Sequence, residues 1–368
     1  MKVLMVSTSY PEDAKDWRGR FISDLVAALA RKKEVGLELW APPGDLPDNV
    51  MATTTPNDIR WLSRLSQLGG IANVLKNRPM SSPFVVIQLL ARLARSYRSL
   101  PVDVCHVNWL QNALPLWGTS TPALISVLGS DFGLLRLPGM ASLLRAVFSQ
   151  RRVILAPNAE WMRPELEHLF GDVAEIYPIV FGVDDAWFSV KRQTVDGAQN
   201  WLAVSRLTKK KIGNLFDWGE GLFGEDRHLH LFGPMQEKIA VPQWVQYHAA
   251  TNPAQLLQTW FPKASGLITL SRHDEGRPQV MLEAMAAGLP VIASDLPAHR
   301  DIVQHMKNGW LAASPASLKQ GIDWLEDEGH NREMGISARE YTKASIGSWG
   351  DCADRYVAAY HKLLKSEL

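Results

Sequence analysis

The chain has 368 residues, of which 46% are hydrophobic and 21% charged, and its formal net charge is +1. This length suits two domains of roughly 170 residues, the composition is typical of a globular protein, and the near-neutral charge argues against a general affinity for nucleic acid or another polyanion. The two cysteines, Cys105 and Cys352, exclude a disulfide framework and a cysteine-based metal site, and they favour a reducing compartment.

Strands that alternate with helices along the chain predict an α/β fold with parallel sheets and helices on both faces. In the first half, apolar spacing predicts a helix at 21–31, and strands are predicted at 3–7, 37–40, 102–107, 123–127 and 153–156. In the second half, strands are predicted at 201–204, 228–232, 267–270 and from 290 onward, and a last helix at 352–364. The polar stretch that begins at 182 lacks periodicity, so we expect a linker at 183–199 between domains at 1–182 and 200–350.

The first residues, MKVLMVSTSYP, contain too short an apolar run for a signal peptide. No run of about 18 apolar residues occurs in the sequence, so we expect no membrane-spanning helix and a cytoplasmic protein. The sequence also contains no internal repeat and no low-complexity segment.

The most informative segment is LITLSRHDEGRPQVMLEAMAAGLPVIA, at 267–293. It predicts a strand at 267–270, a polar loop, a helix that begins at Pro278 and ends before Gly288, and then a second strand. Pro278 suits the first helical position, and Gly288 suits a left-handed helix exit. The free N–H groups of the first turn, around Gln279–Met281, form a site for an anion.

Two carboxylates bracket the start of this helix. Glu275 is predicted in the loop at the carboxyl end of a strand, where open α/β sheets bind ligands. Glu283 lies about five residues, or roughly 7–8 Å, along the helix, and its side chain tilts back toward the N-terminus. Two carboxylates that bind hydroxyls beside a phosphate site are what a nucleotide sugar requires. The alternative is an ordinary strand–loop–helix unit whose acids satisfy the helix dipole.

The string from Glu275 to Ile292, EGRPQVMLEAMAAGLPVI, resembles the donor-binding signature of retaining GT-B glycosyltransferases of the family 4 type. The resemblance implies that Glu275 holds hydroxyls of the donor sugar and Glu283 those of the ribose. His273, two residues before Glu275, is placed to contact the transferred sugar. Further donor contacts are implied for the residues between the two acids, which are Gly276, Arg277, Pro278, Gln279, Val280 and Met281.

The segment VSRLTKKK, at 204–211, resembles the family's diphosphate clamp. Arg206 follows a strand and would hold phosphate oxygens with its planar fork, and Lys211 would add a point charge. The family has glycine after this lysine, whereas Ile212 stands here, so Lys210 remains an alternative to Lys211. A solvated basic turn is the other interpretation. Gly233 resembles the family's glycine turn near the nucleoside, although Gly-Pro ends many strands.

The resemblance is looser in the first domain. Gly19 is the candidate for the family's glycine-rich loop near the donor phosphates, or it is a plain turn glycine. Relatives carry histidine before the sequence Gly-Ser-Asp, but this chain has Leu128, which cannot make the same polar contact. Asp131 is expected to orient the acceptor or the donor. His106 ends a predicted strand, where a lone histidine is more often structural than catalytic.

Residues 59–102 are basic, with seven Arg or Lys residues and no acid. The basic residues are Arg60, Arg64, Lys76, Arg78, Arg92, Arg95 and Arg98. Gln88, Arg92 and Arg95 fall on one helical stripe, with apolar residues around the rest. Basic amphipathic helices that carry tryptophan suit an anionic membrane surface. The alternative is that the apolar faces pack on the domain's own sheet while the arginines face water.

The resemblance implies a GT-B architecture, in which two Rossmann-like domains face each other across a cleft and the last helix joins the first domain. It implies transfer of a sugar from a nucleoside-diphosphate sugar to a hydroxyl of a glycan or lipid-linked acceptor, with retained configuration and no cofactor or metal. Cell-surface polysaccharide or glycolipid synthesis at the inner membrane face is the expected setting. Two alternatives are a degenerate GT-B binding or scaffold protein and a nucleotide-sugar epimerase. The implied catalytic residues are Glu275, Arg206, Lys211 and Asp131.

Overall fold

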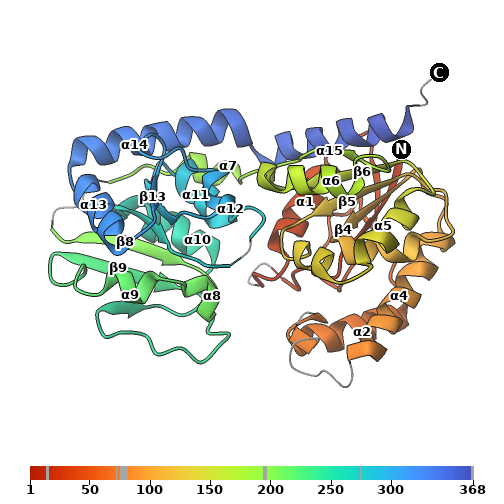
Figure 1. Ribbon diagram of the computed structural model, residues 1–368, viewed down its shortest axis with the longest axis horizontal. Helices are drawn as coiled ribbons and strands as arrows, with labels where there is room; N and C mark the ends of the chain where they lie inside the picture. The colour runs from red at the N-terminus through yellow and green to blue at the C-terminus, as the bar shows by residue number, and fades with distance from the viewer. Residues whose placement is uncertain (14–15, 72, 75–81, 194–196, 274, 366–368) are drawn as a thin grey trace. The chain divides into compact units, whose positions relative to one another are not determined.

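The computed structural model describes residues 1–13, 16–71, 73–74, 82–193, 197–273 and 275–365. The chain divides into two compact units. Figure 1 shows the chain coloured from red at its N-terminus to blue at its C-terminus. Unit 1 comprises Met1–Phe181 and Trp349–Leu368, and unit 2 comprises Gly182–Ser348. The stretch 183–199 is part of unit 2 and contains a short helix, so it differs from the separate linker that the sequence suggests.

Unit 1 contains a seven-stranded sheet in the order β3-β2-β1-β4-β5-β6-β7, and every neighbouring pair is parallel. Its strands are β1 (Lys2–Val6), β2 (Gly36–Trp40), β3 (Met51–Ala52), β4 (Val104–Asn108), β5 (Ala123–Val127), β6 (Val153–Pro157) and β7 (Glu175–Ile176). Its helices are α1 (Arg20–Ala30), α2 (Pro56–Gln67), α4 (Ser82–Ser99), α5 (Met140–Phe148), α6 (Arg163–Phe170) and α15 (Trp349–Leu364), with 3₁₀ helices η1 (Leu110–Leu116), η2 (Phe132–Arg136) and η3 (Glu160–Met162).

Both faces of this sheet are buried. Alternate residues of β1 point to opposite faces, so Val3 and Met5 join one hydrophobic core while Leu4 and Val6 join the other. This explains why the central strands read as nearly continuous apolar runs rather than as alternating patterns.

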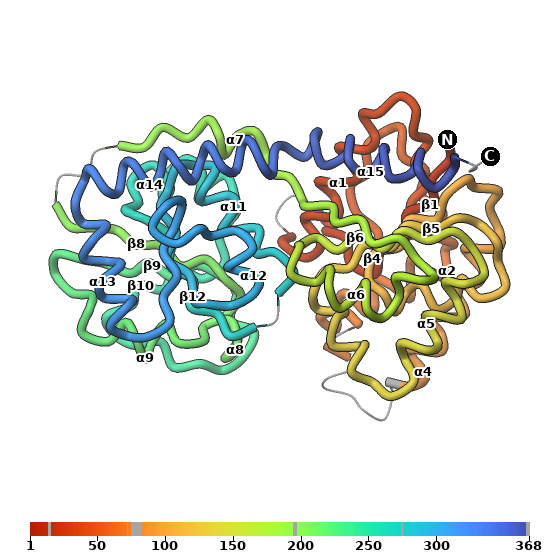
Figure 2. Tube along the Cα trace, turned by 45° about the horizontal axis from the view of Figure 1, so that its top comes forward, coloured from red at the N-terminus to blue at the C-terminus, as the bar shows by residue number. Residues whose placement is uncertain are grey.

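The C-terminal helix α15 belongs to unit 1, as the resemblance implied, and it contacts α1 (Figure 2). A buried polar network joins it to the sheet. His106 Nδ1 lies 2.6 Å from Tyr360 Oη, His106 Nε2 lies 2.8 Å from Ser126 Oγ, and that Oγ lies 2.9 Å from Tyr356 Oη. All four side chains are wholly buried. His106 is therefore a structural residue.

Unit 2 contains a six-stranded parallel sheet in the order β10-β9-β8-β11-β12-β13. Its strands are β8 (Gln199–Val204), β9 (Arg227–Phe232), β10 (Val245–Tyr247), β11 (Gly266–Thr269), β12 (Val291–Ser294) and β13 (Trp310–Ala312). Its helices are α7 (Asp185–Phe188), α8 (Lys209–Ile212), α9 (Leu215–Gly219), α10 (Pro253–Gln255), α11 (Gln279–Ala286), α12 (Pro297–Arg300), α13 (Pro315–Leu325) and α14 (Glu328–Tyr341), with η4 (Leu256–Trp260), η5 (Phe261–Lys263) and η6 (Thr342–Ile346).

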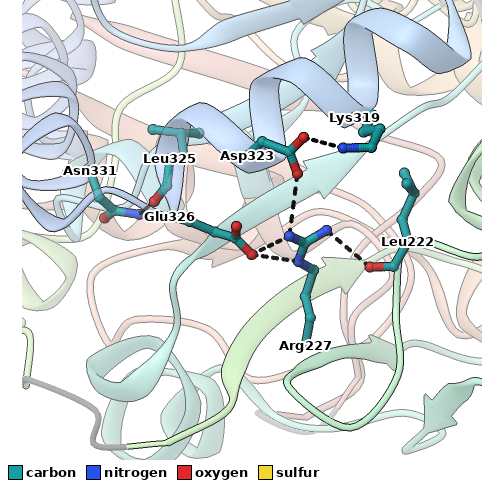
Figure 3. A network of polar contacts seen from close by, with 7 residues as sticks. All are labelled: Leu222, Arg227, Lys319, Asp323, Leu325, Glu326 and Asn331. Atoms are coloured by element: carbon teal, nitrogen blue, oxygen red, sulfur yellow. Dashed lines mark hydrogen bonds and ion pairs between the residues drawn. The ribbon is translucent and has the colours of Figure 1, made fainter.

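A polar network fixes α13 to the rest of unit 2 (Figure 3). Arg227, at the start of β9, donates from Nε to Glu326 Oε1 at 2.8 Å and lies 3.4 Å from Asp323 Oδ1. Its Nη1 also donates to the carbonyl oxygen of Leu222 at 3.1 Å. Asn331 of α14 donates to the carbonyl oxygen of Leu325 at 2.9 Å. Because the acids are partly exposed, we attribute to these ion pairs a role in orientation rather than a large stabilisation.

Within the described ranges, no helix combines the length and the hydrophobicity that are needed to cross a bilayer.

Candidate functional site

Two glycines bring together three loops at the carboxyl ends of β8, β9 and β11. Gly213 has a φ of +56°, and a Cβ there would lie 2.0 Å from the carbonyl oxygen of Leu270. Gly233 has a φ of +141°, and a Cβ there would lie 1.8 Å from the carbonyl oxygen of Ser205. Only glycine fits either position. The loop after β8 is thereby held against the loops that follow β9 and β11.

Backbone hydrogen bonds fix the same arrangement. Asn214 donates its N–H to the carbonyl oxygen of Leu270 at 3.0 Å, and Arg272 donates its N–H to that of Lys210 at 2.8 Å. Thr208 caps α8 by accepting the N–H of Lys211 at 3.2 Å. The short helix α8 therefore has a defined orientation beside the end of β11.

This arrangement pairs Lys211 with Glu275. Lys211 Nζ lies 2.5 Å from Glu275 Oε2, and the two side chains are only 16% and 12% exposed. Ser271 Oγ donates to Glu275 Oε1 at 3.1 Å and accepts the N–H of His273 at 3.0 Å. Both oxygens of the Glu275 carboxylate are thus oriented by neighbours in the same unit.

The electrostatics of the pair follow from its burial. Burial alone would raise the pKa of Glu275, but the Lys211 ammonium outweighs it, and the pKa lies below its ordinary value. Burial lowers the pKa of Lys211, and Glu275 opposes this shift. The site therefore holds a carboxylate and an ammonium in close contact.

The two lysines that the sequence leaves open differ in their contacts. Lys210 has an exposed side chain, and its carbonyl oxygen accepts the N–H of Arg272. Lys211 contacts Glu275, and the following Ile212 is buried in the core of unit 2. This geometry favours Lys211 over Lys210, although glycine follows one residue later than the family pattern has it.

Arg206 lies near this pair. Its side chain is exposed, yet the protein atoms around its guanidinium desolvate it and lower its pKa, while Glu275 acts in the opposite direction. Arg206 in turn contributes to lowering the pKa of Lys211. His273 also acts electrostatically on Glu275. The Glu275 carboxylate therefore interacts electrostatically with Arg206, Lys211 and His273.

Helix α11 begins one residue later than the sequence predicts. Pro278 is its N-cap, with φ −68° and ψ 110°, rather than its first helical residue. The N–H of Met281 donates to the carbonyl oxygen of Pro278 at 3.2 Å, and Gln279 Nε2 donates to that of Gly182 at 2.7 Å. The Met281 side chain is wholly buried, and Glu283 lies half-buried in the second turn.

Two arginines bind the other end of α11. Arg339 donates from Nε to the carbonyl oxygen of Ala286 at 3.0 Å and from Nη2 to that of Ala287 at 2.7 Å. Arg192 donates from Nη1 to the carbonyl oxygen of Gly288 at 3.2 Å. Cations at a helix C-terminus complement its dipole, so they stabilise α11 in place.

Arg277 differs from the expected donor contact. Its side chain is 4% exposed and forms an ion pair with Asp301, which follows α12. Its Nη2 also lies 3.3 Å from the carbonyl oxygen of Asp301. Arg277 thus connects the loop that contains Glu275 to the end of α12. The prediction of Arg277 as a donor-binding residue is not supported by this geometry.

His299 of α12 is a site neighbour that sequence reasoning missed. It is wholly buried, and its Nδ1 lies 2.8 Å from the carbonyl oxygen of Ser294. Ser294 Oγ in turn donates to the carbonyl oxygen of Ser271 at 2.7 Å. His299 and Glu275 also interact electrostatically. The local sequence Pro-Ala-His-Arg carries no signal for this position, because only the sheet brings β12 beside β11.

In unit 1, Asp131 holds the backbone. It is 4% exposed, and its Oδ2 and Oδ1 accept the N–H groups of Leu110 and Leu128, both at 3.0 Å. Burial raises its pKa to about 6, and these hydrogen bonds oppose the shift. The carboxylate therefore ties the segments after β4 and β5 together. A direct catalytic role, as expected from the sequence, is not supported by this geometry.

Two other expectations for unit 1 concern backbone positions. Gly19 is the N-cap of α1 with a φ of +67°, and a Cβ there would lie 2.7 Å from Ser9 Oγ and 2.8 Å from backbone atoms. The close packing at this turn is by itself enough to require glycine. The contact of Gly19 with the donor phosphates stays a prediction. Leu128 is buried in one of the hydrophobic cores of unit 1. An apolar side chain therefore stands where the resemblance would place a histidine.

The basic segment 59–102 is only partly a free surface, and Lys76 and Arg78 lie outside the described residues. Arg92 forms a buried ion pair with Asp58, directly before the segment, and lies 4.9 Å from the centre of the Trp61 ring. Gln88 accepts a hydrogen bond from Trp61 Nε1 at 2.6 Å. The predicted stripe of Gln88, Arg92 and Arg95 therefore binds α4 to α2 through two of its members.

Among the described residues, no group of three or more His, Cys, Asp or Glu side chains is arranged to hold a metal ion.

Comparison with known protein families concerns one segment of unit 2. Residues 241–341 match the family model described as "Glycosyl transferases group 1". This segment is therefore similar to the group 1 glycosyltransferases. The matched segment contains Glu275 and Glu283, and it begins after Arg206 and Lys211.

Two curated relatives are themselves glycosyltransferases or synthases of glycosides. The chain is 26% identical to D-inositol 3-phosphate glycosyltransferase of Gordonia bronchialis, over 47% of this chain and 37% of that protein. It is 30% identical to N-acetyl-alpha-D-glucosaminyl L-malate synthase of Bacillus anthracis, over 32% of this chain and 30% of that protein. The match thus spans about a third of the length of these relatives.

Solved structures confirm the predicted fold class. Sucrose-phosphate synthase of Thermosynechococcus elongatus has a TM-score of 0.72 at 16% identity, and the match covers 99% of each chain. HepE of Anabaena, in complex with UDP-glucose, has a TM-score of 0.66 at 14% identity, over 98% of this chain and 100% of that one. At these identities the likeness shows the fold, which is that of the GT-B glycosyltransferases.

Proposed function

We propose that this protein is a group 1 glycosyltransferase, which transfers a sugar from a nucleoside-diphosphate sugar to a hydroxyl acceptor with retention of configuration. The observation that carries the proposal is the 2.5 Å contact between Lys211 and Glu275, with Arg206 nearby, at the carboxyl edge of the unit 2 sheet. This edge is where open α/β sheets bind nucleotides. A carboxylate for sugar hydroxyls and two cations for a diphosphate suit such a donor.

The residues of unit 2 have distinct proposed roles. Arg206 and Lys211 bind the diphosphate and neutralise charge on the departing nucleoside diphosphate, so they do the work for which other enzymes use a metal. Glu275 accepts hydrogen bonds from hydroxyls of the transferred sugar, and Glu283 accepts those of the ribose. The acceptor hydroxyl attacks from the same face that the phosphate leaves, and a phosphate oxygen takes its proton. We accordingly propose that turnover needs no metal ion.

Relatives support the substrate classes. HepE is described with UDP-glucose bound, which favours a nucleotide-sugar donor. An Amylovoran biosynthesis glycosyltransferase of Erwinia amylovora is 31% identical over 26% of this chain and 28% of that protein. This relative favours a glycan or lipid-linked acceptor in the synthesis of a cell-surface polysaccharide.

We also propose that α2 and α4 of unit 1 contact an anionic membrane surface at the inner face of the cell membrane. Phe84 and Ile87, three residues apart on α4, are each 64% exposed, and Arg60, Arg64 and Arg95 are exposed nearby on the two helices. Apolar side chains with flanking cations suit insertion at the headgroups of anionic lipids.

Co-sedimentation with vesicles tests this surface. The protein should bind vesicles that contain phosphatidylglycerol and not vesicles of phosphatidylcholine alone, and Phe84→Ser with Ile87→Ser should abolish binding. Ile336→Ser, which removes a 52% exposed isoleucine from unit 2, is the matched control and should leave binding intact. Equal binding by the wild type and the α4 variant would contradict the proposal.

Product analysis tests the enzymatic proposal. With a suitable donor and acceptor, the proposal predicts free nucleoside diphosphate and a new glycoside of retained configuration, in the presence of EDTA as well. A rearranged nucleotide sugar would instead indicate an epimerase. Binding of the donor without any product would favour a degenerate scaffold protein.

A further inference from the structure

His299 carries a buried nitrogen for which the proposed reaction gives no role. Its Nδ1 lies 2.8 Å from the carbonyl oxygen of Ser294, and a carbonyl oxygen can only accept. Nδ1 therefore carries the proton, and the neutral ring has a lone pair on Nε2. Among the described residues, Nε2 is buried without a hydrogen-bond partner. Such a group in a native interior calls for a physical explanation.

A chain of hydrogen bonds connects this histidine to the donor carboxylate. His299 bonds to Ser294, Ser294 Oγ donates to the carbonyl oxygen of Ser271 at 2.7 Å, and Ser271 Oγ donates to Glu275 Oε1 at 3.1 Å. His299 and Glu275 are also close enough to interact electrostatically. His299 is therefore linked to the Glu275 carboxylate through Ser294 and Ser271.

The charged groups around Glu275 and His299 are themselves paired, and the ammonium that contacts Glu275 is that of Lys211. Lys211 is 2.5 Å from Glu275, and these two groups act on His299 in opposite directions. On its own element, Arg300 is paired with Asp295, and the following Asp301 is paired with Arg277. Burial keeps His299 neutral by lowering its pKa. Lys211 is therefore the cation in direct contact with Glu275 before a donor binds, while Arg206 acts on the same carboxylate from nearby.

We propose that donor binding is coupled to proton uptake at His299 Nε2, so that the imidazolium replaces Lys211 as the counter-charge of Glu275 when Lys211 turns to the diphosphate. The inference rests on the proposed function, because it needs a diphosphate that competes for Lys211. The proton comes from solvent, and no bond other than the new N–H forms. His299 is a positioning residue, since it holds the Glu275 carboxylate in its ionised state.

The direction of the pH dependence follows. The pKa of His299 lies below its ordinary value in the free protein, and the arriving negative charge raises it in the complex. Between the two values, donor binding takes up a proton, so affinity falls as the pH rises, by at most about tenfold per pH unit for one linked proton. Below the pKa of His299 in the free protein and above its pKa in the complex, the titration of His299 no longer makes the affinity depend on pH.

Titration calorimetry at pH 7 in two buffers of different ionisation enthalpy tests the inference. The ligands are UDP-, GDP-, ADP- and dTDP-glucose, whose diphosphate diesters do not themselves titrate near this pH. The wild type should take up a substantial fraction of a proton on binding. His299→Asn keeps a donor toward Ser294 but cannot titrate, so it should bind without uptake. His273→Asn removes the other histidine near Glu275. Because His273 is itself an expected sugar contact, the affinity should fall, but the proton uptake per bound ligand should remain.

The outcomes separate the two proposals. If none of the four nucleotide sugars binds, the proposed function fails and the inference falls with it. If one binds without proton uptake, or if uptake persists in His299→Asn or disappears only in His273→Asn, the inference alone is overturned. If His299→Asn does not fold, ¹⁵N spectra of the wild-type histidines decide instead. His299 should change from the Nδ1–H tautomer to imidazolium when the ligand is added, and an unchanged tautomer would refute the proposal.

Discussion

Lys211 Nζ lies 2.5 Å from Glu275 Oε2, although the two residues belong to separate motifs, one that follows β8 and one that follows β11. The contact arises because β8 and β11 are neighbouring parallel strands, so that their carboxyl ends meet at one edge of the sheet. The two glycines of the adjoining loops allow the close approach. The contact is the centre of the proposed donor site.

Lys211→Ala should weaken binding of the donor nucleotide by about 1.5–3 kcal/mol, the usual worth of hydrogen bonds to a charged group. Lys210→Ala is the matched control, because Lys210 is the neighbouring lysine with an exposed side chain. It should change the affinity little. Calorimetry on both variants decides the register of the clamp. A larger loss of affinity in Lys210→Ala than in Lys211→Ala would contradict this prediction. It would show that Lys210, and not the lysine that contacts Glu275 in the free protein, binds the diphosphate.

Gly213→Ala should destabilise unit 2 and displace the lysine loop. An alanine would combine a strained φ of +56° with a Cβ 2.0 Å from the carbonyl oxygen of Leu270, and backbone strain of this kind costs about 1–3 kcal/mol. Gly224→Ala is the control, because nothing lies within 4 Å of its Cβ position. Thermal melting should show a lower Tm for Gly213→Ala alone. Equal Tm values for the two variants would contradict the packing argument.

The buried His106 should make stability depend on pH. Burial lowers its pKa from 6.5 to about 3, so the unfolded chain binds more protons than the folded one between these values. Stability from this group is present above pH 6.5 and is lost as the pH falls. Asp131 has the opposite sign, since burial raises its pKa to about 6 and favours the folded state as the pH falls.

Comparison with His106→Gln isolates the histidine, because Asp131 is common to both proteins. Urea unfolding of the wild type should lose stability faster than that of His106→Gln as the pH is lowered from 6.5. Parallel stability curves would show that the His106 network does not persist in the neutral form described.

Asp58→Ala should destabilise unit 1 by about 3–5 kcal/mol, because it leaves the Arg92 guanidinium uncompensated at a site that is 18% exposed. It also removes the capping box of α2, in which Asp58 bonds back to Thr55. Arg95→Ala, at an exposed position of α4, should stay near the wild-type stability. Urea unfolding monitored by far-ultraviolet circular dichroism provides the measurement. A small effect of Asp58→Ala would mean that the pair does not hold α2 to α4.

The sequence predicted the central strands within about two residues but missed four strands at the sheet edges. These are β3 and β7 in unit 1 and β10 and β13 in unit 2, each of two or three residues. Central parallel strands are buried on both faces and read as apolar runs. An edge strand this short has no periodicity to detect, and pairing with its neighbour alone defines it.

The candidate site shows a similar division. Glu275, Lys211 and Arg206 could be proposed from the sequence because the chemistry of a diphosphate sugar demands those groups in motifs of recognisable spacing, and their roles stay predictions. The structural partners of Arg277 and Asp131, which are Asp301 and two backbone N–H groups, could not be predicted, because they are not adjacent in sequence. His299 was missed for the same reason.

A thermal-shift comparison of the wild type and Arg206→Ala with UDP-, GDP-, ADP- and dTDP-sugars tests the central claim most directly. If unit 2 binds a nucleotide-sugar donor through the described cations, one nucleotide class should raise the Tm of the wild type and leave that of Arg206→Ala unchanged. No shift with any class, or equal shifts for the two proteins, would contradict the account.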